Sequence, residues 1–441
     1  MMRRIAILTA VSAAMILAQP NPGRPRPPQQ PPPAQPQPQQ QPPAAAPQRA
    51  QTGAPLPGLT LGELALFNKG KEAFDEADDV PGGLGPRFNL DSCGGCHSHP
   101  ATGGTSPAVN PQIAAATRMG AANRVPNFLQ LDGPVRVVRF QRNPNGTPDG
   151  GVHNLFTIAG RGDAPGNCRI AQPDFSRADN LVFRIPTPVF GLGLIEAIPD
   201  STLRANLGAD VARKRTLGIG GRFNTNGNDG TITRFGWKAQ NKSLLIFSGE
   251  AYNVEVGVTN ELFPQEREED PACAVSVSVE DRTNTETGEV SDAELFTQFM
   301  RWLAPPRPAT TDAAIDRGRL AFETTGCAAC HTPLLRTGRN ASAALNQRDV
   351  PLYSDLALHR MGQRLNDGVI QGDARGDEWR TAPLWGVGQR IFFLHDGRTR
   401  DLSEAIARHD SPGSEARQVV ANFNALTPQQ RQDLLSFLRS L

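Results

Sequence analysis

Two five-residue motifs constrain this chain more than any other feature of its sequence. Cys93–His97 and Cys327–His331 both read C-x-x-C-H. With 6 Cys and 7 His in 441 residues, the chance expectation for one such motif is about 0.001 per chain. At this spacing two thiols can bond the two vinyl groups of one porphyrin, and the next imidazole reaches the iron from the same side.

The motifs therefore predict two covalently attached c-type haems. The thiols that would attach them are those of Cys93, Cys96, Cys327 and Cys330. His97 and His331 would be the iron ligands, one for each haem.

A C-x-x-C pair also occurs in zinc sites and redox dithiols, and both remain alternatives. A zinc ribbon places its second pair about 15–20 residues after the first. Cys96 and Cys327 are separated by more than half of the chain. A redox dithiol does not require His at the next position in both copies. Haem attachment is therefore the favoured interpretation.

The N-terminus has the pattern of an export signal. Met1–Arg4 is basic, Ile5–Ala18 is apolar, and Ala18 is a suitable cleavage position. We predict a signal peptide over residues 1–18 and a periplasmic location, where c-type haem is attached. The apolar run is too short for a confident membrane span, so we expect no transmembrane segment in the mature chain.

Composition limits the partners and the folded region. Residues 19–57 are rich in Pro, Gln and Ala, which predicts a disordered linker. The 45 basic and 44 acidic residues nearly cancel, so no nucleic acid partner is expected. Cys168 and Cys273 are the two Cys outside the motifs. In an exported chain a disulfide between them is favoured, with two free thiols as the alternative.

A short internal repeat precedes the two motifs. Gly70–Asp75 and Gly318–Glu323 share the pattern G-[KR]-x-A-F-[DE]. A helix leading into C-x-x-C-H is how a cytochrome c domain begins, so the repeat predicts two such domains. We predict a mainly α fold with two cytochrome c-like haem domains, long irregular loops and a few short strands. The N-terminal domain spans 58–305, with long insertions, and the C-terminal domain spans 306–441.

Local signals mark the ends of two helices and two short strands. Thr60 with Glu63, and Thr427 with Gln430, form capping-box patterns. The first helix should bury Leu66, Gly70, Ala73, Phe74 and Ala77, and the last helix Leu434, Leu438 and Leu441. Strands are expected at 135–140 and 274–279. The segment 224–230 loosely resembles a calcium loop without its final Glu, so calcium is a weak alternative to a simple turn.

Several segments resemble the bacterial di-haem oxidoreductase family, whose members are described as peroxidases or thiol oxidoreductases. They are Gly82–Asn89, Ser92–His97, Pro188–Glu196, Glu378–Gly386 and Leu394–Arg398. The resemblance extends from about residue 58 to the C-terminus. The family is distantly similar to the di-haem cytochrome c peroxidases, and more remotely to the rubber oxygenases.

The resemblance implies a sixth ligand for the second haem. The peroxidase relatives have a [YF]-x-H-D-G segment followed, fourteen residues after its His, by the Met that ligates the C-terminal haem. Here the segment is His395-Asp396-Gly397, and His409 stands at the position of that Met. His409 is thus the implied ligand opposite His331. Two imidazole ligands lower a haem potential relative to His/Met ligation.

The first haem has no evident sixth ligand in the sequence. His153, His359, His395, Met119 and Met361 are candidates for ligation, and packing roles are equally compatible with each. An iron with an open position can bind an oxidant.

The candidate catalytic group near that iron is Glu196. A carboxylate among apolar neighbours is suited to proton transfer, and capping of a turn before Pro199 is the alternative. Trp237, Trp379 and Trp385 are either electron relays or core residues.

The sequence therefore predicts an exported di-haem c-type cytochrome that acts as a peroxidase-like oxidoreductase. Electrons would enter at the C-terminal haem from a small periplasmic cytochrome or cupredoxin. Peroxide or another small oxidant would bind at the N-terminal haem. A pure electron-transfer cytochrome and a haem oxygenase or protein-modifying oxidase remain the alternatives.

Overall fold

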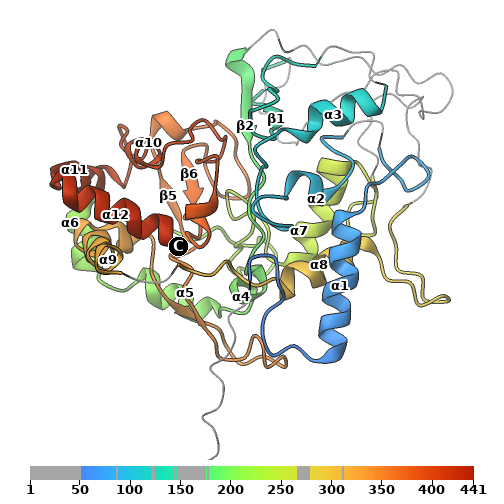
Figure 1. The fold of residues 1–441 in the computed structure, drawn as a ribbon, viewed down its shortest axis with the longest axis horizontal. Helices are drawn as coiled ribbons and strands as arrows, with labels where there is room; N and C mark the ends of the chain where they lie inside the picture. The colour runs from blue at the N-terminus through green and yellow to red at the C-terminus, as the bar shows by residue number, and fades with distance from the viewer. Residues whose placement is uncertain are drawn as a thin grey trace, which may run out of the picture. The chain divides into compact units, whose positions relative to one another are not determined.

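The computed structural model describes residues 51–85, 88–120, 125–142, 145–146, 175, 178–265, 279–309 and 312–441 (Figure 1). All of them belong to one compact unit, Pro47–Leu441. The predicted signal peptide, most of the predicted linker, Cys168, Cys273, His153 and the strand residues 274–278 lie outside the described residues.

The described chain is mainly helical, as predicted. The α-helices are α1 (Leu61–Asp75), α2 (Cys93–Cys96), α3 (Pro111–Arg118), α4 (Leu192–Glu196), α5 (Asp200–Leu207), α6 (Val211–Leu217), α7 (Leu244–Ala251), α8 (Asp292–Trp302), α9 (Ala313–Thr325), α10 (Leu402–Ala407), α11 (Arg417–Ala425) and α12 (Pro428–Ser440). A π-helical segment, Tyr252–Val256, continues α7. None of the helices within the described ranges is long and apolar enough to cross a membrane.

The strands are short and form three two-stranded antiparallel sheets. They are β1 (Val137–Phe140) with β2 (Leu181–Arg184), β3 (Leu335–Arg336) with β4 (Asp349–Val350), and β5 (Leu358–Arg360) with β6 (Glu378–Arg380). Val137 pairs with Arg184 in the first sheet, and His359 pairs with Trp379 in the third. The strand predicted at 135–140 is confirmed over its last four residues.

Two helix pairs repeat along the chain. Helix α1 packs against α8, and α9 packs against α12 (Figure 1). The glycines of the sequence repeat, Gly70 and Gly318, stand at the two crossings. A Cβ on Gly70 would lie 2.2 Å from the Leu295 carbonyl oxygen, and one on Gly318 would lie 2.0 Å from that of Asp433. No side chain fits there, which explains why both copies of the repeat begin with Gly.

The phenylalanines of the repeat line up in the same way. The ring of Phe74 lies 4.9 Å from that of Phe299 and 5.9 Å from the His97 ring. In the second pair the ring of Phe322 lies 5.4 Å from Phe437 and 6.4 Å from His331. Each Phe therefore joins its helix pair to the histidine of its C-x-x-C-H motif.

Local sequence signals were accurate at the helix ends. Both predicted capping boxes are present, at Thr60 and at Thr427. The stripe on α12 is buried as expected, at Leu434, Leu438 and Leu441.

The predicted buried face of α1 is partly wrong. Leu66 is 37% exposed and Phe67 is buried in its place, because α8 packs against the face that carries Phe67, Gly70 and Phe74. Helix α1 ends at Asp75, before Ala77. Ordered packing begins before residue 58, since Leu56 is buried and its N–H donates to the Trp302 carbonyl at 2.7 Å.

Candidate functional site

Each C-x-x-C-H segment forms a single helical turn. Ser92 caps α2, and the His97 N–H donates to the Cys93 carbonyl at 3.0 Å. The second motif begins after Gly326 with a 3₁₀ turn, in which the His331 N–H donates to the Cys327 carbonyl at 2.9 Å.

In both copies the turn brings the two thiols and the imidazole to the wall of one cavity. Cys93 and Cys96 line the cavity of His97, and Cys327 and Cys330 line the cavity of His331. Burial raises the pKa of all four thiols, so each is protonated at neutral pH. The two thiols of each motif therefore share a cavity with the histidine of that motif.

Both motif histidines are oriented in the same way. Nδ1 of His97 donates to the Gly104 carbonyl, and Nδ1 of His331 donates to the Tyr353 carbonyl, each at 3.0 Å. Burial lowers the pKa of each imidazole to about 4. Each ring is therefore neutral at physiological pH, which is the form that binds a metal. Nε2 of His331 is left available, while the His97 ring has a second backbone hydrogen-bond partner, Thr187.

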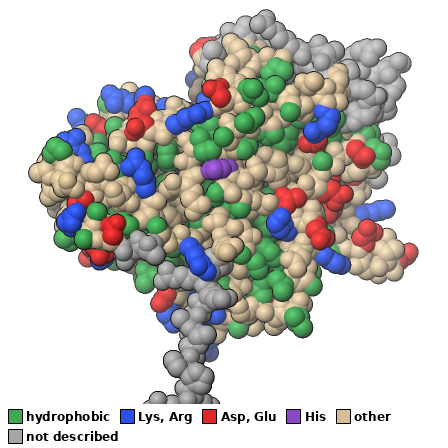
Figure 2. Space-filling view, viewed as in Figure 1, with side chains coloured by type: hydrophobic (Ala, Val, Ile, Leu, Met, Phe, Trp, Pro, Cys, Tyr) green, Lys and Arg blue, Asp and Glu red, His purple; other side chains and the backbone are tan. Residues whose placement is uncertain are grey.

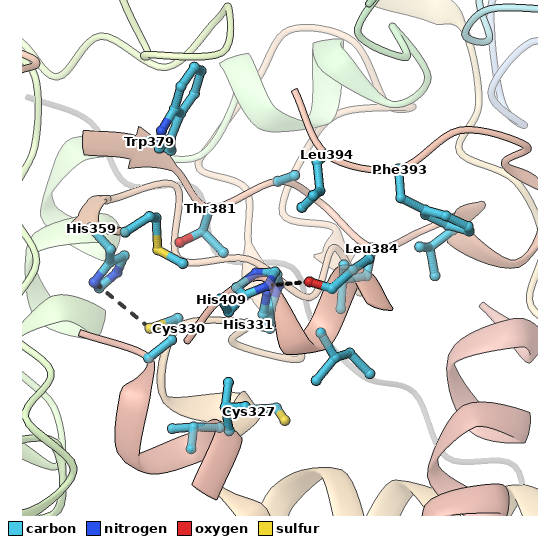
Figure 3. A pocket seen from close by; sticks show the side chains of 18 of the residues that line it. Cys327, Cys330, His331, His359, Trp379, Thr381, Leu384, Phe393, Leu394 and His409 are labelled. Carbon is cyan, nitrogen blue, oxygen red and sulfur yellow. Dashed lines mark hydrogen bonds between the residues drawn. The ribbon is translucent and has the colours of Figure 1, made fainter. Parts of the chain in front are cut away.

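The cavity beside His331 also contains His409, as Figure 3 shows. Nδ1 of His409 donates to the Ala405 carbonyl at 2.8 Å, which again leaves Nε2 available. Burial lowers the pKa of His409, and its proximity contributes to the lowered pKa of His331. The structure thus brings together the two histidines that the sequence assigned to one haem.

This cavity contains two buried arginines, Arg380 and Arg390, whose surroundings indicate whether haem fits there. Neither makes an ion pair with a described residue, and Nε of Arg390 is buried without a hydrogen-bond partner. Burial lowers the pKa of each guanidinium to about 10. Two buried cations without an anion call for an anionic ligand, and haem carries two propionates. The cavity is otherwise apolar, so its donor set fits haem.

The other histidines of this cavity are already occupied or stacked. His359 contacts Asp355 at 3.0 Å and Glu415 at 2.8 Å through its two ring nitrogens, and its Nδ1 lies 3.8 Å from the Cys330 sulfur. These contacts raise the pKa of His359 against the opposing effect of burial. The His395 ring stacks on Trp379 with centroids 3.8 Å apart. Both ring nitrogens of His359 are therefore engaged, whereas the stacked ring of His395 is held by its face.

The second cavity lies beside His97 and is more polar. Its wall includes Arg184 of β2, Gln240, Glu250 and Glu255. Nε of Arg184 and Oε1 of Gln240 are buried without hydrogen-bond partners. The unpaired Nε–H of Arg184, in the same wall as two thiols and an imidazole, is a donor that fits a haem propionate.

Two segments, one in each half of the described chain, share the same local pattern of backbone contacts and helix caps. A backbone bridge joins Phe235 to Asn241, and an equivalent bridge joins Phe393 to Thr399. Two residues later, Ser243 caps α7 and Asp401 caps α10, each accepting the N–H three residues on.

His409 is the eighth residue after the second of these caps, and Ala251 is the eighth after the first. Both residues line their cavities. The position that carries a histidine in one cavity therefore carries an alanine in the other.

One family model matches more than half of the chain. The model of the family "Di-haem oxidoreductase, putative peroxidase" matches residues 138–441. The chain belongs to this family. Its members use haem, so the chain is a haem-dependent oxidoreductase. The match includes Cys327–His331 and begins after Cys93–His97. No curated protein matches the chain.

The solved structures that resemble this chain have low sequence identity to it. The diheme peroxidase BthA from Burkholderia thailandensis is 15% identical, with 86% of each chain covered and a TM-score of 0.37. A MauG-like protein associated with microbial copper homeostasis is 19% identical, with 57% of this chain and 89% of that chain covered and a TM-score of 0.29. A hydrazine synthase chain of Kuenenia stuttgartiensis is 16% identical over 44% of this chain and 60% of that one, less than two thirds of its length, with a TM-score of 0.25.

One tryptophan of this di-haem oxidoreductase lines both cavities. Trp237 contributes to the walls beside His97 and beside His331. Its ring centroid lies 6.4 Å from Trp379 and 6.4 Å from His395, and its Nε1 donates to the Ile185 carbonyl at 3.0 Å. Of the three tryptophans named from the sequence, Trp385 lines neither cavity.

Glu196 is not among the residues that line the cavity beside His97. Its Oε1 accepts the Leu244 N–H at 2.9 Å, at the start of α7, and its Oε2 lies 3.4 Å from Arg301. Glu196 therefore caps the start of α7, and not the turn before Pro199 that the sequence suggested. Its role in proton transfer stays an untested prediction.

Two carboxylates that sequence reasoning missed do line this cavity, Glu250 and Glu255. Burial, reinforced by the charge of Glu250, raises the pKa of Glu255 to about 7. A carboxyl group with that pKa can both give and take a proton near neutral pH. The sequence Tyr-Asn-Val-Glu-Val around it carries no recognisable signal.

The loop considered for calcium is held by its own contacts. Asp229 accepts from the Thr231 N–H at 3.0 Å and pairs with Lys242 at 2.5 Å. Within the described ranges no group of three His, Cys, Asp or Glu side chains is placed to hold a metal ion. Met361 lines the cavity beside His331, and Met119 lines neither cavity.

Proposed function

We propose that this chain is an exported di-haem c-type cytochrome that reduces peroxide. Two cytochrome c-like domains, 58–305 and 306–441, would each hold one haem through the thiols of its C-x-x-C-H motif. His97 and His331 would be the proximal ligands, and His409 the sixth ligand of the second haem. The family assignment, the paired cavities and the neutral motif histidines support this proposal.

The observation that carries the proposal is the difference between Ala251 and His409. An alanine cannot ligate iron, so the haem beside His97 would keep a position for peroxide. The haem beside His331 would be saturated by two imidazoles and suited to electron transfer. A peroxidase that receives electrons from a donor protein needs one haem that binds peroxide and one that transfers electrons.

The side chains around the cavities then have distinct tasks. When bound, haem supplies the iron that exchanges electrons and cleaves the peroxide bond. Glu255 would take a proton from one peroxide oxygen and give it to the other, which leaves as water. Arg380 and Arg390 would hold the propionates of the second haem and neutralise their charge in the buried wall.

Electrons would enter at the cavity beside His331 and cross to the cavity beside His97. Trp237 is the candidate bridge because it touches both walls. A small periplasmic cytochrome or cupredoxin is the proposed donor. Charges of both signs are interspersed over the face shown in Figure 2, consistent with the near-zero net charge of the chain. The signal peptide at 1–18 and the linker at 19–57 complete the proposal.

Electron paramagnetic resonance of the di-haem protein, fully oxidised and after one-electron reduction, tests this function. We expect a high-spin ferric signal in at least one state, and its loss on adding cyanide or peroxide. Ala251→His should convert that signal to low spin and abolish the reaction with peroxide. His409→Ala is the reciprocal control, and it should create a second high-spin signal.

The alternatives predict other outcomes of the same experiment. Two low-spin signals in both states, unchanged by small ligands, would identify a pure electron-transfer cytochrome. A high-spin site that consumes oxygen and ignores peroxide would identify an oxygenase or protein-modifying oxidase.

A further inference from the structure

A buried tyrosine stands beside the cavity of His97 without lining it. Tyr252 is 2% exposed and begins the π-helical segment that also carries Glu255. Its ring centroid lies 4.9 Å from Phe296, which is part of the cavity wall. Phe296 in turn lies 5.9 Å from Phe74, the ring that contacts His97. Aromatic rings therefore connect the tyrosine to the proximal histidine.

The hydroxyl of this tyrosine points to acidic groups. It donates to Asp78 Oδ1 at 3.0 Å, and Asp292 Oδ2 lies 3.5 Å away. Burial, together with the negative charges of Asp78, Asp292 and Asp281, raises the pKa of Tyr252. Asp78 and Asp292 are half-buried, so solvent reaches part of each residue, whereas Tyr252 is buried.

This environment favours removal of an electron together with the phenolic proton. Negative charges stabilise the loss of an electron from a nearby ring. The carboxylate at hydrogen-bond distance is the acceptor that the proton needs. Burial raises the pKa of Asp78 to about 7, so it can hold that proton and release it at neutral pH.

The other aromatic candidates have a less suitable environment. Lys238 Nζ lies 4.0 Å from the centroid of the Trp379 ring, and Arg184 Cζ lies 5.4 Å from it. These positive charges oppose electron loss from Trp379. Tyr353, the second tyrosine of the chain, packs between Phe322 and Phe437, and its hydroxyl has no hydrogen-bond partner among the described residues.

We propose that Tyr252 is a redox-active residue that carries oxidising equivalents from the cavity of His97 to the protein surface. Peroxide takes up two electrons and two protons and becomes two molecules of water. Tyr252 replaces one of those electrons and passes its phenolic proton to Asp78, which leaves a neutral tyrosyl radical. An electron donor too large to enter the cavity reduces the radical from outside, and the proton returns from Asp78.

This inference rests on the proposed peroxidase function, and freeze-quench electron paramagnetic resonance tests the two separately. The di-haem protein is mixed with hydrogen peroxide, and both the haem absorption and the radical signal are followed. Because the chain has 2 Tyr, the comparison of Tyr252→Phe with Tyr353→Phe assigns the radical, and ring-deuterated tyrosine verifies it. Asp78→Asn keeps the tyrosine and removes its proton acceptor.

We expect a tyrosyl signal in the parent protein and in Tyr353→Phe. Its yield should fall at least tenfold in Tyr252→Phe and in Asp78→Asn, while the haem absorption still responds to peroxide in all four proteins. A haem response without a tyrosyl radical, or a radical that survives in Tyr252→Phe, overturns this inference and leaves the peroxidase function standing. A haem that does not respond to peroxide overturns both. Should Tyr252→Phe fail to fold, Asp78→Asn with deuterated tyrosine gives the decision.

Discussion

Lys238 offers a quantitative test of the packing between the two cavities. Its side chain is fully buried, with Nζ bonded to three carbonyls of the segment 375–378 and 3.2 Å from Asp367 Oδ1. The ammonium group also lies over the Trp379 ring. Burial lowers the pKa of Lys238 from 10.5 to about 8, despite the attraction of Asp367.

The sign and size of the resulting pH dependence follow from this shift. Between pH 8 and 10.5 the unfolded chain holds a proton on Lys238 that the folded chain has released. The free energy of unfolding therefore rises with pH across this window. Each pKa unit corresponds to about 1.4 kcal/mol, so the whole window is worth about 3 kcal/mol and the interval from pH 8 to 9.5 about 2 kcal/mol.

Urea unfolding followed by far-ultraviolet circular dichroism, at pH 8.0, 8.75 and 9.5, measures this effect. Lys238→Met should abolish the rise. Lys242→Met is the matched control, because Lys242 pairs with Asp229 at the surface and its loss should change stability by less than about 1 kcal/mol at every pH. A flat profile in the parent protein, or an equal slope in Lys238→Met, would refute the buried-ammonium reasoning.

Three further predictions address the repeat and the cavities. Gly70→Ala should destabilise the protein by about 2 kcal/mol or more, because the new Cβ would meet the Leu295 carbonyl. Gly62→Ala is the control and should not destabilise the protein, because Gly62 has open space around it. Thermal unfolding of the two variants measures the difference. In the parent protein the rate of peroxide reduction should rise as pH increases through about 7, and Glu255→Gln should lower the rate about 100-fold or more and remove this dependence. Trp237→Phe should slow electron transfer between the haems in stopped-flow reduction while both haem spectra stay unchanged.

The features predicted from the sequence are those encoded within a few neighbouring residues. Both capping boxes, the mainly helical class and the buried stripe of α12 depend on local hydrogen bonds and helical periodicity. The G-[KR]-x-A-F-[DE] repeat was also informative, because its Gly and Phe make the same contacts in both helix pairs. The pairing of His331 with His409 came from the family resemblance, and the cavity brings the two together.

The features that were missed depend on contacts between distant segments. The face that α1 buries is decided by where α8 packs, so periodicity alone placed Leu66 inside. The apolar neighbours of Glu196 in the sequence did not indicate the direction of its side chain, which accepts a hydrogen bond from the first residue of α7. Glu255 lines the cavity because a π-helical turn follows α7, which no sequence pattern indicated.

The most informative positions are those at which the two halves correspond and yet differ. Trp237 and His395 each stand two residues after the start of equivalent backbone bridges, and the two rings lie 6.4 Å apart between the cavities. Ala251 and His409 each stand eight residues after equivalent caps, and each lines its own cavity. This shared framework would allow the same kind of helix pair to hold a haem in each half. The positions at which the two halves differ would make one haem reactive, keep the other closed and place a tryptophan between them. Exchanging Ala251 and His409 is therefore the most direct way to move the reactive site from one half to the other.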